Sequence, residues 1–200
     1  MAVKKKEANW KHEIHELFAD SWNFLVGKKK FFFIAMFLFI AGSLIGFMEA
    51  DLFGEYFKEL IKEIAGQTYG LDFVEMFWFI FSNNLTSSLV AIVLGVFFGI
   101  FPIFHALFNG TLLGYVYFEV SAKAGWGVIW RLLPHGIFEL PAIFISIGLG
   151  IYIGSAMFYP ERKKNLILRI KESLKVFLTI IFSLLVIAAF IESFLISFVG

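Results

Sequence analysis

Long apolar runs separated by short polar segments dominate this 200-residue chain. Five of the runs approach or exceed the ~20 helical residues that cross a bilayer. They are predicted at Phe31–Phe47, Phe73–Phe101, Ile103–Val120, Pro134–Phe158 and Val176–Val199. Pro102, directly before the third run, predicts a tight hairpin between the second and third helices. The fold class predicted is all-α, a polytopic membrane helical bundle with about five transmembrane helices plus amphipathic surface helices.

Two further segments carry apolar stripes at helical spacing, one before and one after the first span. Their members are Trp10, Ile14, Leu17, Phe18, Trp22 and Leu25 in the first, and Leu52, Phe53, Tyr56, Phe57, Leu60, Ile61 and Ile64 in the second. The first stripe is typical of a helix on the membrane surface, with partner binding as the alternative. The second either caps the bundle or meets a membrane or extracellular protein partner.

Basic residues lie on both sides of a block of four spans, in Lys28–Lys30 and again between Arg162 and Lys175. Since cytoplasmic loops are rich in lysine and arginine, both segments are predicted to be cytoplasmic. This predicts a multi-pass cell-membrane protein with its N-terminus cytoplasmic and its C-terminus outside. The chain is interpreted as a single membrane domain, 1–200, with these parts: 1–30, a cytoplasmic amphipathic helix; 49–72, an outer amphipathic segment; 73–158, the core carrying the polar motifs; and 159–175, a cytoplasmic basic connection.

Composition agrees with a membrane protein, because 60% of the residues are hydrophobic and the mean hydropathy is +0.83. The lipid bilayer is therefore the first expected partner. The net charge is +1 and no long basic tract occurs, so nucleic acid is not an expected partner. The absence of cysteine excludes disulfides, thiolate metal sites and cysteine nucleophiles.

Glycines in four of the spans occur in pairs spaced by four residues, which lets helix backbones approach closely. The pairs are Gly42/Gly46, Gly95/Gly99, Gly110/Gly114 and Gly150/Gly154. They predict tight helix packing, either within one chain or also across the interface of a homo-oligomer.

A polar set inside the spans is the candidate site, and it comprises Asn83, Asn84, Asn109, His135 and Glu139. Under the predicted topology these side chains converge on one outward-facing cavity, with His105 as a further step toward the cytoplasm. His135 and Glu139 are four residues apart and share a helix face, where they pair or share an ion. Ionisable groups in a membrane span are costly and by default mark function. The alternative is that these groups only form hydrogen bonds between helices.

An enzyme is not predicted. His135 and Glu139 are candidate metal ligands, but zinc usually takes three or four protein groups, so no cofactor is certain and a metal ion is the one candidate. Ser87 or Ser88 with His135 as base is an unfavoured pairing, because membrane-helix serines usually bond their own backbone. Glu75, Glu119 and Glu192 are expected near outer span ends, within reach of water, and are not assigned to the site.

Three strings together resemble the stage II sporulation protein M family of integral membrane proteins. They are Asn83-Asn84, Phe108-Asn109-Gly110 with Gly114, and Pro134-His135-Gly136 with Glu139-Leu140-Pro141. The resemblance covers roughly Phe73 to Gly154. It implies a membrane scaffold, since the member that named the family works with cell-wall hydrolases during engulfment. Many relatives occur in organisms that form no spores.

Two function classes follow from these observations, of which a non-enzymatic scaffold or assembly factor is the prediction and a transporter or channel is the alternative. A scaffold or assembly factor would bind partners through its surface helices, with the buried polar groups holding the helices together. A small transporter or channel would use the same groups to move a cation or proton. A water-accessible cavity at Glu139 favours transport, and a dry, fully hydrogen-bonded network favours the scaffold.

Overall fold

The computed structural model describes the backbone of residues 2–125 and 129–198 and the side chains of residues 10–123 and 136–198. Within these ranges the chain forms helices and turns and no strand, which confirms the all-α prediction. The helices are α1 (Ala2–Gly27), α2 (Lys29–Met48), α3 (Ala50–Thr68), α4 (Phe73–Val93), α5 (Ile100–Ala124), α6 (Ile129–Gly154), α7 (Arg162–Val176) and α8 (Phe182–Phe198). Short helical turns lie at η1 (Leu94–Val96), η3 (Ser155–Phe158) and η4 (Phe177–Ile181).

Five helical stretches in the described part of the chain are long and apolar enough to cross a membrane, which confirms the predicted number of spans. They are Lys29–Met48, Phe73–Val96, Ile100–Lys123, Gly136–Phe158 and Arg162–Phe198. The last one is longer than predicted, because α7 continues through the wide helical turn η4 directly into α8. The basic segment between the fourth and fifth spans is therefore itself largely helical.

The hairpin between α4 and α5 lies earlier in the chain than predicted. Phe98 and Gly99 both adopt left-handed backbone angles, with φ of 58° and 74°. This conformation ends a right-handed helix, and glycine adopts it at little cost. The second span therefore does not extend to Phe101, and Pro102 lies in the first turn of α5, where a missing N–H leaves no hydrogen bond unmade.

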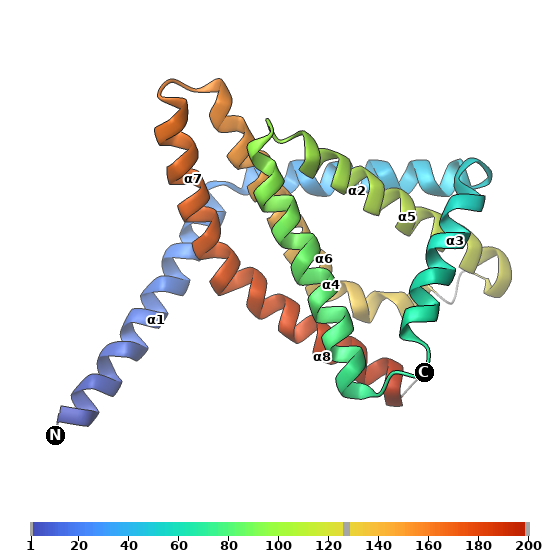
Figure 1. Ribbon diagram of the computed structural model, residues 1–200, viewed down its shortest axis with the longest axis horizontal. Helices are drawn as coiled ribbons and strands as arrows, with labels where there is room; N and C mark the ends of the chain where they lie inside the picture. Colours follow the sequence, from blue (N-terminus) through green and yellow to red (C-terminus); the bar gives the residue numbers. More distant parts are fainter. Residues whose placement is uncertain (1, 126–128, 199–200) are drawn as a thin grey trace.

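Helix α6 is the centre of the bundle, with α2 and α5 as a parallel pair on one side and α4 with α8 on the other (Figure 1). Its segment from Ala142 to Gly150 is buried at every position. The segment contains only small or apolar residues and no charge, and each of its faces contacts a different neighbouring helix. Helix α1 extends away from the bundle toward the N-terminus (Figure 1).

All four glycine pairs are used in packing within the chain. A Cβ atom at Gly46 would overlap the carbonyl of Thr111, and one at Gly114 would overlap the carbonyl of Ser43, so α2 and α5 touch backbone to backbone. In the same way, Gly95 faces Gly150 of α6. Close backbone contact is the usual source of helix association in lipid, where apolar surface gains little from burial.

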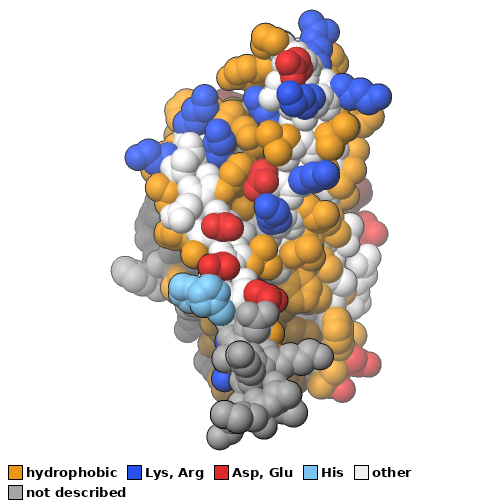
Figure 2. All heavy atoms as spheres, turned by 90° about the vertical axis from the view of Figure 1, so that its left-hand side faces the viewer, with side chains coloured by type: hydrophobic (Ala, Val, Ile, Leu, Met, Phe, Trp, Pro, Cys, Tyr) orange, Lys and Arg blue, Asp and Glu red, His pale blue; other side chains and the backbone are white. Residues whose placement is uncertain are grey.

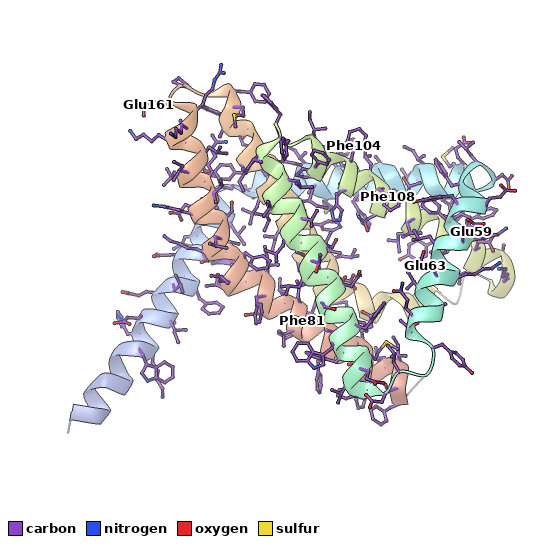
Figure 3. All side chains as sticks on the ribbon, viewed as in Figure 1. Glu59, Glu63, Phe81, Phe104, Phe108 and Glu161 are labelled. Atoms are coloured by element: carbon purple, nitrogen blue, oxygen red, sulfur yellow. The ribbon has the colours of Figure 1, made fainter. Side chains whose placement is uncertain are left out.

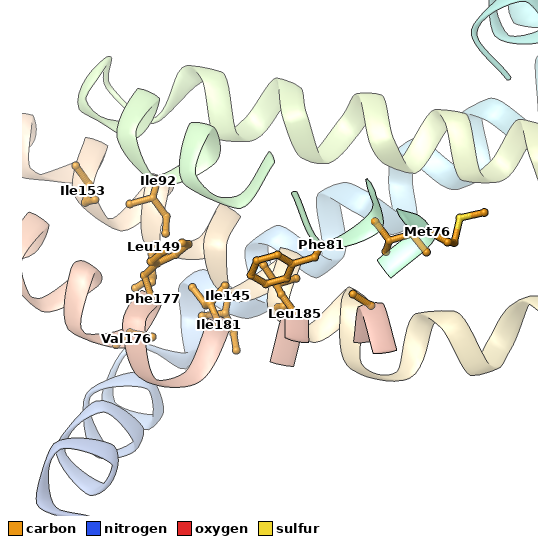
Figure 4. Close-up of a cluster of buried hydrophobic side chains, with 13 residues drawn as sticks. Met76, Phe81, Ile92, Ile145, Leu149, Ile153, Val176, Phe177, Ile181 and Leu185 are labelled. Carbon is orange, nitrogen blue, oxygen red and sulfur yellow. The ribbon is translucent and has the colours of Figure 1, made fainter. Parts of the chain in front are cut away.

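Where no glycine brings two helix backbones into contact, large side chains fill the space between the helices. The largest cluster joins α4, α6 and α8, and Figure 4 shows Phe81, Ile145 and Leu185 at its middle. Outside the core, many large apolar side chains are exposed along the spans. In a bilayer these side chains contact lipid, which agrees with a multi-pass membrane protein.

The two basic segments lie at the same end of the bundle. Lys28 Nζ is 5.3 Å from the centre of the Tyr152 ring, and the Arg169 guanidinium is 4.5 Å from the same ring. Glu161, in the turn before α7, marks this end in Figure 3, whereas Glu59 and Glu63 on α3 mark the other. We call these the basic end and the α3 end. Assigning the basic end to the cytoplasm remains a prediction.

Candidate functional site

Glu139 of α6 lies one turn before the fully buried segment of that helix and is itself half-buried. Asn84, on the neighbouring helix α4, forms a side-chain hydrogen bond with its carboxylate. Asn84 is only 7% exposed, so this contact lies between helices and not at the surface. A carboxylate at this depth has few other donors, and the asparagine amide supplies one.

A partly open cavity of about 320 Å³ lies beside Glu139, in the half of the bundle toward the α3 end. Its polar wall consists of Glu139 from α6, Glu192 from α8 and Asn109 from α5. Leu113, Tyr117 and other apolar residues form the rest. With about 30 Å³ per molecule in liquid water, this volume accommodates on the order of ten waters.

Glu139 and Glu192 interact electrostatically across this cavity. Two carboxylates near each other in surroundings of low polarity repel strongly unless a cation or a shared proton lies between them. The amide of Asn109 adds a further oxygen. An oxygen-rich group of this kind suits a hard cation better than zinc, which prefers nitrogen and sulfur.

The structure brings together three of the five predicted site residues, Asn84, Asn109 and Glu139. Asn83 does not join them, because it is exposed on another face of α4. Neighbouring residues of a helix point roughly 100° apart, so Asn83 and Asn84 cannot both face the cavity. Asn83 therefore lies on the exposed side of α4, away from this cavity.

His135 lies in the first part of α6, and its side chain is outside the described residues. The predicted pairing of His135 with Glu139 therefore stays a prediction. Among the described side chains, no group of three or more histidine, cysteine or acidic residues is placed to hold a metal ion. The cavity instead offers two carboxylates and an amide.

Glu192 is the residue of the cavity that the sequence analysis did not assign. It was expected near the outer end of the last span, within reach of water. The signal that could have found it is its isolation, since it is the only charged residue between Val176 and Val199. An ionisable residue in such a run is a functional candidate by default.

A second polar group lies nearer the basic end, where α4 meets α5. Ser87 Oγ is 2.8 Å from His105 Nε2, and Asn109 Nδ2 donates to the His105 carbonyl at 2.8 Å. Ser88 Oγ and His105 Nδ1 are buried and have no hydrogen-bond partner within the described residues. Buried polar atoms normally have a partner, so this position suits a water molecule or an ion.

These polar residues follow one another along the two helices. Ser88 lies one turn after Asn84 on α4, and Asn109 lies one turn after His105 on α5. The series therefore continues from the cavity at Glu139 toward the basic end. Ser87 pairs with His105, whereas the side chain of His135, the base in the unfavoured pairing with Ser87 or Ser88, lies outside the described residues.

The other acidic residues that the sequence analysis set aside have structural contacts. Glu75 and Asp72 form a capping box that begins α4. Glu119 accepts from Lys123 Nζ at 2.7 Å and lies 3.6 Å from Lys58 Nζ of α3. Helix α3 is thus fixed to α5 by charge and by Phe57, which packs on Tyr115.

Comparison with known proteins identifies relatives of this chain. The sequence model of the family described as stage II sporulation protein M matches residues 33–196. An uncharacterized protein of the archaeon Methanocaldococcus jannaschii is 31% identical, over 71% of this chain and 65% of its own length. This chain therefore spans slightly less than two thirds of that relative. No solved structure matches the chain.

Proposed function

The chain belongs to the stage II sporulation protein M family, and from this premise we propose that it is a small membrane transporter or channel that moves a cation or a proton through the Glu139 cavity. The family establishes an integral membrane protein and leaves its role open. The residues of the cavity suggest the role. Moving an ion or a proton does not require any residue of the cavity to break a covalent bond.

The observation that carries this proposal is the pair of carboxylates on the cavity wall. Glu139 and Glu192 come from different helices, α6 and α8, and interact across a cavity large enough for several waters. Helices that only need to hold together gain nothing from two acids placed near each other, since the pair costs energy when both are ionised. In a site that binds and releases a cation, the repulsion between the two carboxylates is relieved when the cation lies between them.

The route beyond the cavity follows Asn84, Ser88 and the Ser87–His105 pair. Hydroxyl, amide and imidazole groups relay protons or replace the water around an ion. The cavity is at the α3 end and this relay is toward the basic end, so the polar groups extend along much of the bundle. Opening between Ser87 and His105 would complete the path.

The test is ion and proton flux in vesicles reconstituted with the purified protein. Glu139→Gln and Glu192→Gln each remove one charge with little change in shape. Each is expected to lower flux by at least about tenfold, the effect of losing about 1.4 kcal/mol of interaction with the ion. Glu63→Gln, at an exposed position on α3 that does not line the cavity, removes the same charge and should leave flux unchanged.

Bound metal is assayed on the same samples. The transport proposal fails if the wild-type protein shows neither flux nor a bound ion while Glu139→Gln keeps both the stability and the cellular activity of the wild type. In that case the polar groups serve only to hold the helices together, and the scaffold remains.

A scaffold or assembly factor is the second candidate, and one observation favours it. Helix α3 uses Phe57 to dock on α5 but leaves Leu52 and Tyr56 exposed, at 75% and 60%. The same helix carries Glu55, Glu59 and Glu63. An apolar and acidic surface next to the membrane is suited to a membrane or extracellular protein partner.

Site-specific photo-crosslinking in cells tests this second candidate. A crosslinker at Tyr56 should capture one defined partner, whereas a crosslinker at Lys171, exposed at the opposite end of the molecule, should not. Capture of a second copy of the chain at Tyr56 would indicate a homo-oligomer. Equal labelling patterns at both positions would rule out a specific partner on α3.

A further inference from the structure

A second, apolar pocket lies at the basic end, where the end of α1 and the start of α2 meet α6. It has a volume of about 200 Å³. Trp22 and Val26 of α1, Phe32 of α2 and Tyr152 of α6 contribute to its walls, and Lys28 and Lys29 lie at its edge. We call this pocket the α1/α2 groove. Its residues take no part in the Glu139 cavity.

The charge of the groove is positive. Lys29 is exposed, and Lys28 Nζ lies over the Tyr152 ring at 5.3 Å. Helix α2 begins at Lys29 with no side chain capping it, and its Phe31 N–H donates to the Lys28 carbonyl, which leaves the N–H groups of Lys29 and Lys30 for an acceptor. None of the described side chains lining the groove is acidic. Glu172 of α7 lies near Tyr152 but is engaged by Lys175 Nζ at 3.3 Å.

The apolar face of α1 fixes the depth of the groove in the bilayer. Trp10, Ile14, Phe18 and Trp22 are exposed on this face, Trp22 at 61%, and do not pack on the bundle. A helix with such a face lies in the plane of the headgroups with its apolar side toward the acyl chains. The groove continues this face through Trp22 and Val26, so it opens where headgroups and acyl chains meet.

Figure 2 shows the face of the molecule over α1 and α7, with Lys and Arg side chains gathered in its upper part and hydrophobic side chains between them. The exposed residues Lys163 and Lys171 belong to this end. They provide a positive field around the groove, whereas the groove itself combines charge with an apolar wall.

We propose that the α1/α2 groove binds an anionic phospholipid of the adjacent leaflet. One acyl chain lies against Trp22, Val26 and Phe32, and the phosphate is held by Lys28, Lys29 and the first turn of α2. A soluble anion would use the lysines but not the apolar wall, and a neutral lipid would use the wall but not the lysines. Basic pockets between membrane helices recognise anionic headgroups by this combination.

The experiment measures lipid retained by the purified full-length chain. Protein in neutral detergent is mixed with phosphatidylglycerol or with phosphatidylcholine of the same acyl chains, and bound lipid is counted by native mass spectrometry. The wild-type protein should retain phosphatidylglycerol preferentially. The double variant Lys28→Gln/Lys29→Gln should lower this affinity by roughly tenfold or more, because each lysine near the surface contributes to binding of anionic lipid.

The matched control is Lys163→Gln/Lys171→Gln, which removes two charges from the same end without touching the groove. It should retain phosphatidylglycerol like the wild type. An equal loss in both double variants would overturn the groove in favour of diffuse attraction. Equal retention of the two lipids by the wild-type protein would also overturn it, as would equal binding of glycerol phosphate, which lacks acyl chains.

A second variant tests the apolar wall with all charges kept. Val26→Trp fills the groove from an exposed position and should release phosphatidylglycerol, whereas Ile34→Trp, exposed on α2 outside the groove, should not. Because both positions are exposed, neither tryptophan disturbs the core. Unchanged retention in Val26→Trp would contradict the proposed place of the acyl chain.

Discussion

Ser87 Oγ on α4 and His105 Nε2 on α5 lie 2.8 Å apart, and this hydrogen bond joins the two helices near the hairpin that connects them. The two residues are 18 positions apart in the chain. His105 is held further by its own backbone, since Asn109 donates to its carbonyl. The pair therefore fixes how α5 is rotated, and that rotation also directs Asn109 to the cavity wall.

Ser87→Ala is expected to lower the free energy of unfolding by about 1 kcal/mol, the usual contribution of one hydrogen bond. Thr86→Ala is the control, because Thr86 is the preceding residue of α4 and is exposed. Thermal unfolding in detergent, followed by tryptophan fluorescence, measures both. The same decrease in the two variants would show that the Ser87–His105 contact contributes nothing specific.

Asn84→Leu is expected to destabilise the protein by about 1–3 kcal/mol, because it leaves the Glu139 carboxylate without its amide partner. It should also reduce ion flux if Glu139 binds the ion. Asn83→Leu makes the same change one position earlier, at an exposed site that faces away from the cavity. Replacing an exposed amide by an apolar side chain in lipid should leave both quantities unchanged or raise stability. Flux and unfolding temperature in the two variants check this.

Gly46→Ala is expected to cost about 1–3 kcal/mol, since the added methyl group meets the Thr111 backbone and not a side chain that can move. Gly66→Ala is the opposite case, because the space around Gly66 on α3 is open. There alanine should be neutral or stabilise the helix by roughly 0.5–1 kcal/mol. The unfolding temperature of the Gly46→Ala variant should fall, whereas that of the Gly66→Ala variant should stay the same or rise. A tolerated alanine at Gly46 would contradict the close α2–α5 packing.

Arg169 holds α7 against the end of α6. Its Nη1 donates to the Tyr152 carbonyl at 2.6 Å and to Ser155 Oγ at 2.5 Å, and the guanidinium lies over the rings of Tyr152 and Tyr159. Arg169→Gln should lower stability by about 1–3 kcal/mol, because the carbonyl and the rings lose a buried cation. Arg169→Lys should restore only part of this, since lysine lacks the planar group that makes both contacts. Lys171→Gln, exposed on the same helix, should have no effect.

Membrane orientation is tested by single cysteines, which this cysteine-free chain allows without background. Cysteines at Lys29 and Lys163 should be labelled from the cytoplasm only, and one at Lys58 from the outside only, because the basic end is predicted to be cytoplasmic. An impermeant thiol reagent on intact and opened cells makes the measurement. Labelling of Lys58 and Lys163 from the same side would contradict the five-span topology.

Much of the fold was predictable from local properties of the sequence. Five apolar runs of sufficient length predict five spans, because backbone polar groups in lipid require helices of that length. The hairpin was predicted from Pro102 but lies at Gly99, since proline only restricts a helix while the left-handed glycine ends it. The glycine pairs predicted close packing, but not which helices they join.

Part of the candidate site was also predictable from local properties of the sequence. Glu139, Asn84 and Asn109 stand out in sequence as polar residues inside apolar runs. The structure places Glu139 and Asn109 on the wall of one cavity and Asn84 beside Glu139. Asn83 is likewise a polar residue inside an apolar run, but its side chain faces away from the cavity. Glu192 belongs to the cavity but comes from the last span, about fifty residues beyond Glu139 in a chain of 200. Neither the orientation of Asn83 nor the place of Glu192 at the cavity follows from the hydropathy of the sequence.

The sequence by itself determined the number of membrane spans, their approximate places and the cost of each polar residue within them, because these depend on one residue and its neighbours along the chain. Only the tertiary structure decided the rotation of each helix about its axis. That rotation follows from contacts such as Gly46 on Thr111 and Gly95 on Gly150, which join residues distant in sequence. It turns Asn84 inward, leaves Asn83 outside and brings Glu192 beside Glu139, because the faces that pack most closely determine which polar groups meet.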